Sequence, residues 1–279
     1  MNEEKVVLHI EGEEKEYPIG IQYLEIAKEY QSNYEDDIVL VSFDNRLLEL
    51  HKRVKKAGAV SFITTAENAG KKAYRRSMTL LMQKALYNLL GKEISTVRVV
   101  CCISQAYYCE LPNYKTPDEE FLKKLKAEML RMVDLELPIM KSSVKTDDAI
   151  EMFREYGMPE KECLFCYRRS SKVNIYSLEH YIDYFYGYMA AHTGYLKYFD
   201  LLLYEKGFVL LFPGEKAKEV AKFEPSAKYF HTIMSSREWG RAMGVNTVGT
   251  LNNVIASGRM QEIIMVQEAL MEQRIGGMA

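Results

Sequence analysis

The chain has 279 residues, of which 48% are hydrophobic, so it can build the core of one large or two modest domains. Its 37 basic and 39 acidic residues give a net charge of −2, so any nucleic-acid binding would have to come from local basic patches. The absence of an apolar run near 18 residues, a charged N-terminus and an odd number of five cysteines together favour a cytoplasmic protein with reduced thiols and no membrane partner.

Residues 1–66 predict a small mixed domain. Two short extended runs, residues 6–10 and 15–19, flank a turn at Gly12 and predict a hairpin. Apolar residues at helical spacing follow in residues 21–30, and residues 39–43 have the composition of a buried strand. A hairpin, a helix and further strands in this order are typical of a ubiquitin-like β-grasp domain.

From residue 67 the pattern changes to that of an α+β domain. Residues 71–90 predict a long amphipathic helix that ends at Gly91, and residues 97–111 predict a strand or hairpin. The sequence Thr116-Pro-Asp-Glu119 has the pattern of an N-cap, a proline at the first helical position and a capping box, so a helix should begin there and reach about Val133.

The remaining predicted elements complete this domain and add a helical end. Turn and cap signals separate a strand at 138–144, a helix at 146–156, an aromatic helix at 178–189 and a hairpin within 195–212. Beyond residue 213 we expect helices, among them 251–256 and 260–274.

Two quoted stretches carry a resemblance to a known family. Ser61-Phe-Ile-Thr-Thr65, followed by the helix-like run Ala73-Tyr-Arg-Arg-Ser-Met-Thr-Leu-Leu-Met82, resembles the join between the TGS domain and the editing domain of threonyl-tRNA synthetases. The resemblance implies an α+β protein with three parts. These are a TGS-like β-grasp domain at 1–66, an editing-like second additional domain at 67–213 and a helical extension at 214–279.

The same resemblance identifies four degenerate editing-site positions. In the synthetases, one helix presents two histidines four residues apart, and a later helix presents a cysteine and a histidine four residues apart, around a metal or a reacting water. Here these positions are Arg76, Leu80, Phe185 and Met189. Leucine and phenylalanine have no lone pair, methionine is a weak soft donor, and arginine is permanently charged. The resemblance therefore implies an editing fold with no metal, no cofactor and no catalytic residue.

Longer pieces resemble a second group of proteins. His192-Thr-Gly-Tyr-Leu196, Phe208-Val-Leu-Leu-Phe-Pro213 and the stretch 239–252 are similar to the N-terminal half of bacterial uridine-kinase-like (nucleoside kinase) proteins, transferases in which a phosphoribulokinase/uridine kinase domain follows. The chain lacks the pattern Gly-x-x-x-x-Gly-Lys-Ser/Thr that binds nucleotide phosphates. The expected partner is therefore a downstream kinase domain, and ATP and magnesium would be needed only there.

Several isolated side chains are of types that form sites, but their sequence surroundings favour structural roles. Cys163 and Cys166 have the spacing of half a zinc site but no second pair, so buried or loop thiols are favoured. His180 and His192 have no partner at ligand spacing. Asp183 could pair with an arginine, and no nucleophile or second acid accompanies it.

Two basic clusters are the candidate phosphate- or RNA-binding residues. They could face one groove, with the dense tyrosines of residues 167–204 offering aromatic faces to a nucleoside or single-stranded RNA. The clusters are Lys52, Arg53, Lys55 and Lys56 before the last strand of the first domain, and Lys71, Lys72, Arg75 and Arg76 on one helix.

Three functions remain open at this point. The favoured one is a non-catalytic accessory module of a uridine-kinase-like protein, acting in ligand, nucleotide or RNA binding or in homodimer formation. The alternative is a free-standing RNA- or tRNA-binding protein. An aminoacyl-tRNA deacylase is less favoured, because apolar side chains at three of the four positions would fill the space that water and substrate need.

Overall fold

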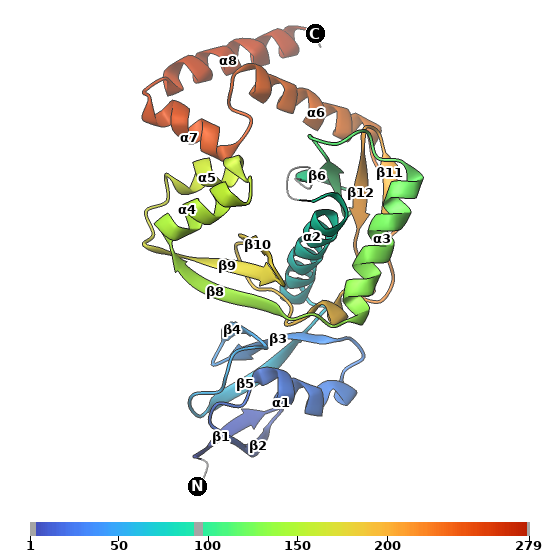
Figure 1. The fold of residues 1–279 in the computed structure, drawn as a ribbon, viewed down its shortest axis with the longest axis vertical. Helices are drawn as coiled ribbons and strands as arrows, with labels where there is room; N and C mark the ends of the chain where they lie inside the picture. Colours follow the sequence, from blue (N-terminus) through green and yellow to red (C-terminus); the bar gives the residue numbers. More distant parts are fainter. Residues whose placement is uncertain (1–3, 92–96, 278–279) are drawn as a thin grey trace. The chain divides into compact units, whose positions relative to one another are not determined.

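A computed structural model describes residues 4–91 and 97–277 (Figure 1). These residues pack as two units, one made of residues 1–142 and 174–224 and the other of residues 143–173 and 225–279. Each unit is made of two separate stretches of the chain, so the division does not test the predicted domain limits at 66/67 and 213/214, which stay predictions.

The first unit begins with a five-stranded sheet in the order β2-β1-β5-β3-β4. Its central strands β1 and β5 run parallel and its other pairs antiparallel, which is the β-grasp arrangement that the sequence predicts. Leu8 and Ile10 are fully buried because alternate residues of β1 face the domain core. The elements are β1 (Lys5–Ile10), β2 (Glu13–Pro18), α1 (Tyr23–Tyr30), η1 (Gln31–Asn33), β3 (Ile38–Phe43), β4 (Arg46–Glu49) and β5 (Gly58–Thr64).

The long helix α2 (Asn68–Leu90) follows the sheet and is buried over most of its length. It contacts α3 (Glu119–Asp134), β10 (Tyr181–Asp183) and the short helix η2 (Thr193–Tyr195). Gly91 ends α2 with a φ of +76°, as predicted from its position. An antiparallel four-stranded sheet completes the unit in the order β11-β12-β7-β6. Its strands are β6 (Arg98–Ile103), β7 (Ala106–Glu110), β11 (Asp200–Tyr204) and β12 (Gly207–Leu211).

The start of α3 (Glu119–Asp134) differs from the prediction. The N-cap is Asp118, whose carboxylate accepts a hydrogen bond from the backbone N–H of Phe121 at 2.8 Å. Thr116 and Pro117 lie before the helix, so the predicted capping box with Glu119 is wrong. An aspartate caps a helix as well as a threonine does, and it also places negative charge at the positive end of the helix dipole.

The predicted aromatic helix at 178–189 is also wrong. This stretch contains the end of β9 (Lys172–Leu178), then β10 (Tyr181–Asp183), and an irregular segment after it. Burial alternates along β10, since Tyr181 and Asp183 are buried and Ile182 is less so, and this period of two belongs to a strand. The three strands of this sheet lie in the order β10-β9-β8, with β8 at Ile139–Lys145.

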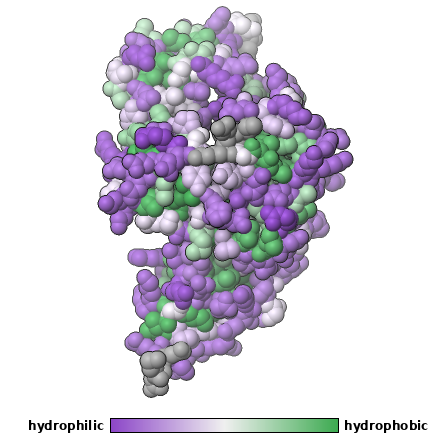
Figure 2. Space-filling view, viewed as in Figure 1, coloured by the Kyte–Doolittle hydropathy of each residue, from purple (hydrophilic) through white to green (hydrophobic). Residues whose placement is uncertain are grey.

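The second unit is built mainly from helices. Phe153 and Phe165 form its core contact, with ring centroids 4.9 Å apart, and Gly249 lies against Cys163 so closely that an added Cβ would stand 2.9 Å from the sulfur. Its helices are α4 (Thr146–Glu155), α5 (Pro159–Phe165), α6 (Ala227–Ala242), α7 (Val248–Ala256) and α8 (Met260–Gly276). The face in Figure 2 is mostly hydrophilic, with separate hydrophobic patches that include part of the C-terminal helical region.

The observed elements confirm the predicted fold class. The structure is α+β, with a β-grasp domain first, an α+β part that resembles a synthetase editing domain, and helices at the C-terminal side. Within residues 4–91 and 97–277, no helix has both the length and the apolar character needed to cross a membrane.

Candidate functional site

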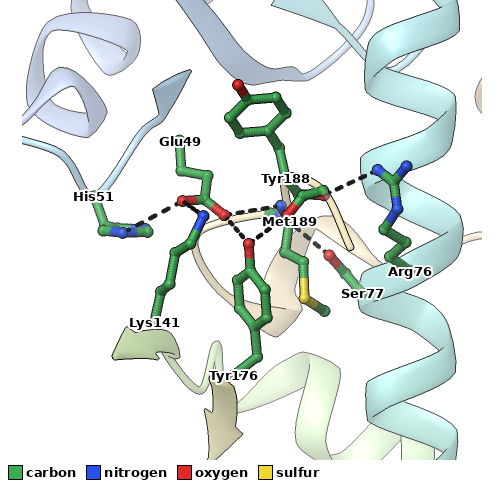
Figure 3. A network of polar contacts seen from close by, with 10 residues as sticks. Glu49, His51, Arg76, Ser77, Lys141, Tyr176, Tyr188 and Met189 are labelled. Atoms are coloured by element: carbon green, nitrogen blue, oxygen red, sulfur yellow. Dashed lines mark hydrogen bonds and ion pairs between the residues drawn. The ribbon is translucent and has the colours of Figure 1, made fainter. Parts of the chain in front are cut away.

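Helix α2 and the irregular segment 184–190 carry the four degenerate editing-site positions. The Ser77 hydroxyl accepts a hydrogen bond from the backbone N–H of Ala190 at 2.8 Å, and the Arg76 guanidinium donates to the carbonyl of Tyr188 at 3.3 Å. These two bonds hold the segment along the helix (Figure 3). Phe185 and Met189 therefore lie on an irregular segment and not on a second helix.

The side chains at these positions are all withdrawn from solvent, wholly or in part. Leu80 is fully buried and Met189 is 1% exposed, while Arg76 and Phe185 are partly buried. The Arg76 guanidinium lies so close to Gly187 that a Cβ added there would meet its Cζ at 2.5 Å. In the described ranges, no group of three or more His, Cys, Asp or Glu side chains could hold a metal ion.

A buried carboxylate lies next to this segment. Glu49, the last residue of β4, is 1% exposed. Its Oε1 accepts hydrogen bonds from the Tyr176 hydroxyl at 2.5 Å and from the backbone N–H of Met189 at 3.2 Å. Its Oε2 lies 3.1 Å from the ammonium of Lys141 on β8 (Figure 3). Glu49 thus binds the backbone of one of the degenerate positions directly.

The surroundings of Glu49 compensate for the burial of its charge. A carboxylate removed from water is stable only when it is paired and its oxygens accept hydrogen bonds. Lys141 supplies the opposite charge, and its ammonium also lies 5.1 Å from the ring centre of Tyr176 and 5.6 Å from that of Tyr188. Burial and the bond to Glu49 raise the pKa of Tyr176, so its hydroxyl stays protonated and keeps donating.

His51 faces the same carboxylate without joining the hydrogen-bonded network. Its Nε2 lies 3.7 Å from Oε2 of Glu49, and both ring nitrogens are buried with no hydrogen-bond partner. Burial lowers the pKa of His51, although the Glu49 charge opposes that effect, so the ring is neutral at pH 7. Lys141 is therefore the cation that balances Glu49.

One residue of this network is conspicuous in the sequence itself. Glu49 stands between Leu48 and Leu50 in an apolar run, and a charged residue in such a run is either on an exposed face or buried with a partner. The partners Lys141 and Tyr176 could not be found in this way, because they lie 92 and 127 residues further along the chain.

The two basic clusters line different cavities. The first cluster lies in the loop between β4 and β5, where all four side chains are exposed. Three residues of this cluster line a cavity of 580 Å³, together with further charged and apolar side chains. The lining residues are Arg53, Lys55 and Lys56 of the cluster, the charged residues Asp44 and Arg46, and the apolar or aromatic residues Tyr23, Phe43 and Leu48.

The second cluster is held by contacts of its own on α2. The Lys71 ammonium lies 3.4 Å from the carbonyl of Glu215, and the Arg75 guanidinium stands 5.3 Å from the ring centre of Phe212. Both side chains line a small cavity with Thr65, Tyr74, Phe212 and Pro213. Lys72 is exposed, and Arg76 faces Gly187.

The remaining candidate side chains have local roles. The Cys163 sulfur accepts from the amide of Asn253 at 3.5 Å, and Cys166 is exposed. His192 is the N-cap of η2, where its Nδ1 accepts from the N–H of Gly194 at 3.2 Å. Asp183 is 1% exposed and accepts from the N–H of Tyr184, while His180 is exposed.

Comparison with known proteins finds similarity to threonine–tRNA ligases, while no family profile matches the chain. The ligase of Carboxydothermus hydrogenoformans is 28% identical over 192 residues, which are 68% of this chain and 30% of the ligase. That of Symbiobacterium thermophilum is 28% identical over 200 residues, or 70% and 30% of the two chains. That of Thermotoga maritima is 27% identical over 194 residues, or 69% and 29%.

These similarities support the TGS and editing-like resemblance and do not concern uridine kinases. The matching part of the ligases is their N-terminal region, and the chain spans about 30% of the length of these relatives. The chain is thus similar to the N-terminal accessory region of threonine–tRNA ligases.

Proposed function

We propose that the chain is a non-catalytic accessory module of a uridine-kinase-like (nucleoside kinase) protein, in which an editing-like fold serves ligand binding or docking. One observation carries the non-catalytic part. The position where the synthetases place a histidine is Met189, which is 1% exposed and whose backbone N–H is bonded to the buried Glu49.

Editing chemistry needs a water and an open position beside the group that activates it. Here Leu80 and Met189 supply buried apolar side chains, and Arg76 is engaged with the carbonyl of Tyr188. The hydrogen bonds of Ser77 and Glu49 fix this segment, so it is not poised to open for a substrate. The fold is retained for its surfaces, and the aminoacyl-tRNA deacylase reading is the least favoured of the three.

The kinase part rests on the stretches 192–196, 208–213 and 239–252, which resemble uridine-kinase-like proteins. They lie at η2, along β12, and across the end of α6 and the start of α7. The partner is a kinase domain that would itself bind ATP and magnesium. A homodimer would bring two such modules together.

Two measurements test this proposal. The purified chain should not hydrolyse seryl- or threonyl-tRNA above the uncatalysed rate. Hydrolysis that Glu49→Gln abolishes would instead support the proposal that the chain is an aminoacyl-tRNA deacylase. An antibody raised against the chain should detect a polypeptide well above 32.3 kDa in the cells of origin. A native product of 32.3 kDa would exclude a covalently attached kinase domain.

A free-standing RNA- or tRNA-binding protein is the second candidate. It is supported by the relatives, whose names give tRNA as a substrate, and by the exposed basic loop of the β-grasp domain. Binding through phosphates should weaken steeply as salt rises. The test is filter binding of tRNA at 50 and 200 mM salt to the parent chain and to the variant Lys52→Ala with Arg53→Ala. Binding that falls with salt and with these substitutions would support an RNA-binding protein, and absence of binding would contradict it.

A further inference from the structure

The cavity of the β-grasp domain combines a positive rim with an apolar floor. Its volume of 580 Å³ lies in the usual range of small-molecule sites. Four cationic side chains and one carboxylate line it, so positive charge prevails. The cationic residues are Arg46 at the start of β4 and Arg53, Lys55 and Lys56 in the loop before β5.

Partners inside the protein already use part of this charge. The Lys56 ammonium lies 3.3 Å from Asp44, and it also stands 5.4 Å from the ring centre of Phe43. Asp44 in addition accepts from the N–H of Ala59 at 3.0 Å, a bond that lowers its pKa and keeps it ionised. Lys56, with a smaller electrostatic contribution from Arg46, therefore balances Asp44, the only carboxylate among the lining residues, and Arg53 donates to the carbonyl of Gly20 at 2.7 Å.

Two cations remain to meet a ligand. Across residues 4–91 and 97–277, no hydrogen bond or ion pair engages the Arg46 guanidinium or the Lys55 ammonium. Arginine can bind a phosphate through two parallel N–H bonds, and a lysine beside it adds a second positive charge. A phosphate between these two side chains would therefore complete the charge balance of the rim.

The apolar floor is fixed before any ligand arrives. Tyr23 is 2% exposed and Phe43 is 8% exposed, with ring centroids 6.1 Å apart. Gly58 lets the Phe43 ring lie against its backbone, since an added Cβ would collide with the ring. Leu48 is only partly buried, and together with the small exposed part of Phe43 it offers apolar surface for the organic part of a ligand.

We propose that this cavity binds a phosphate ester, with the phosphate on Arg46 and Lys55 and the organic part over Phe43 and Leu48. This inference rests on the ligand-binding part of the proposed function. The phosphate could belong to a free nucleotide or to the end of an RNA strand. The attached kinase domain is a separate claim, and the mass of the native polypeptide tests it independently.

The test is ligand-observed NMR titration of the purified chain with UMP and AMP, with uridine and adenosine, and with a ten-nucleotide RNA that carries or lacks a 5′-phosphate. The double variant Arg46→Ala with Lys55→Ala should weaken binding of phosphorylated ligands at least tenfold. The control variant Lys5→Ala with Lys28→Ala removes two lysines of the same domain that do not line the cavity, and it should change the Kd less than twofold. Circular dichroism would establish that both variants are folded.

Binding of the mononucleotides would support a free nucleotide as the source, and binding of only the phosphorylated RNA would support an RNA end. Either result supports the proposal if the unphosphorylated partner binds at least tenfold more weakly. The proposal fails if no phosphorylated ligand binds, if nucleosides bind equally well, or if the two double variants weaken binding to the same extent.

Discussion

The carboxylate of Glu49 lies 3.1 Å from the ammonium of Lys141, and this pair joins β4, an edge strand of the β-grasp sheet, to β8 across 92 residues of sequence. The Glu49 side chain is 1% exposed and that of Lys141 is 15% exposed, so water screens their attraction little. A buried ion pair adds little net stability when formed, but removing one partner leaves an uncompensated charge. The pair therefore makes the packing of these two strands sensitive to a single substitution.

Replacing Lys141 with methionine should be strongly destabilising. Because Glu49 would stay buried without a cation, the free energy of unfolding in urea should fall by about 3–5 kcal/mol. The double variant Glu49→Gln with Lys141→Met should lose clearly less than the two single losses combined, since the uncompensated charge is then absent.

The control for this pair is Lys216→Met. Lys216 pairs with Glu219 at 3.1 Å, but both side chains are largely exposed, so the change should cost less than about 1 kcal/mol. Equal losses for Lys141→Met and Lys216→Met would show that the Glu49 pair has no special weight in stability.

Removing the hydroxyl of Tyr176 tests the hydrogen bonds of Glu49. The Tyr176 hydroxyl contacts both Glu49 and the carbonyl of Gly187. Tyr176→Phe keeps the ring and leaves these acceptors with one donor fewer, so thermal or urea unfolding should show a loss of about 1–3 kcal/mol. Tyr186 is 81% exposed, and Tyr186→Phe should be close to neutral. A neutral Tyr176→Phe would mean that other donors satisfy Glu49.

Local periodicity explains which elements could be predicted. β1 and β5 alternate buried residues with more exposed ones, and α2 repeats apolar residues at helical spacing up to Gly91, so local patterns in the sequence predict these elements. The predicted helix at 178–189 is wrong because the aromatic residues of this stretch satisfy a helical spacing as well as that of a short strand. Gly187, with a φ of +131°, was the signal against a continuous helix.

The candidate functional site could be predicted only in part, because its contacts join segments that are far apart in the sequence. The degenerate positions Arg76, Leu80, Phe185 and Met189 came from a resemblance, and the structure shows how Arg76 and Met189 are held. The Glu49 network depends on three segments that are distant in sequence, and no local pattern records such a meeting. The sequence does not mark Tyr23 and Phe43 as cavity residues either, because single aromatic residues in such positions fit a buried core equally well.

Gly187 should tolerate no side chain. Its φ of +131° is a region that residues with a Cβ rarely adopt, and an added Cβ would meet the Arg76 guanidinium at 2.5 to 2.8 Å. Gly187→Ala should therefore lower the free energy of unfolding by about 1–3 kcal/mol. Adding Arg76→Ala should restore only the part that comes from the contact, because the backbone strain remains.

The matched control is Gly276→Ala at the end of α8, where no atom lies within 4 Å of the added methyl group. Alanine is the better helix former, so this change should be neutral or stabilising by up to about 1 kcal/mol. If Gly187→Ala were as mild as Gly276→Ala, the segment 184–190 would have to be freer to rearrange than its hydrogen bonds indicate.

Two partly buried histidines should make the protein less stable in mild acid. Burial lowers the pKa of His192 and of His51 below the ordinary value of 6.5. The unfolded chain then binds more protons than the folded one as the pH falls below about 6.5, so stability is complete above that pH and decreases below it. Each histidine can contribute a loss of up to about 1.4 kcal/mol per pH unit.

His192→Asn isolates one of these contributions. Asparagine can still accept from the N–H of Gly194 as an N-cap, but it does not titrate, so the variant should lose less stability than the parent between about pH 7.5 and 5.5. The measurement is urea unfolding at steps of half a pH unit, kept above the range in which carboxyl groups titrate. Between about pH 7.5 and 8.5 the two proteins should run parallel, because His192 is neutral in both the folded and the unfolded chain. An unchanged slope in mild acid would show that the folded protein accommodates the His192 charge, for instance through water reaching the ring.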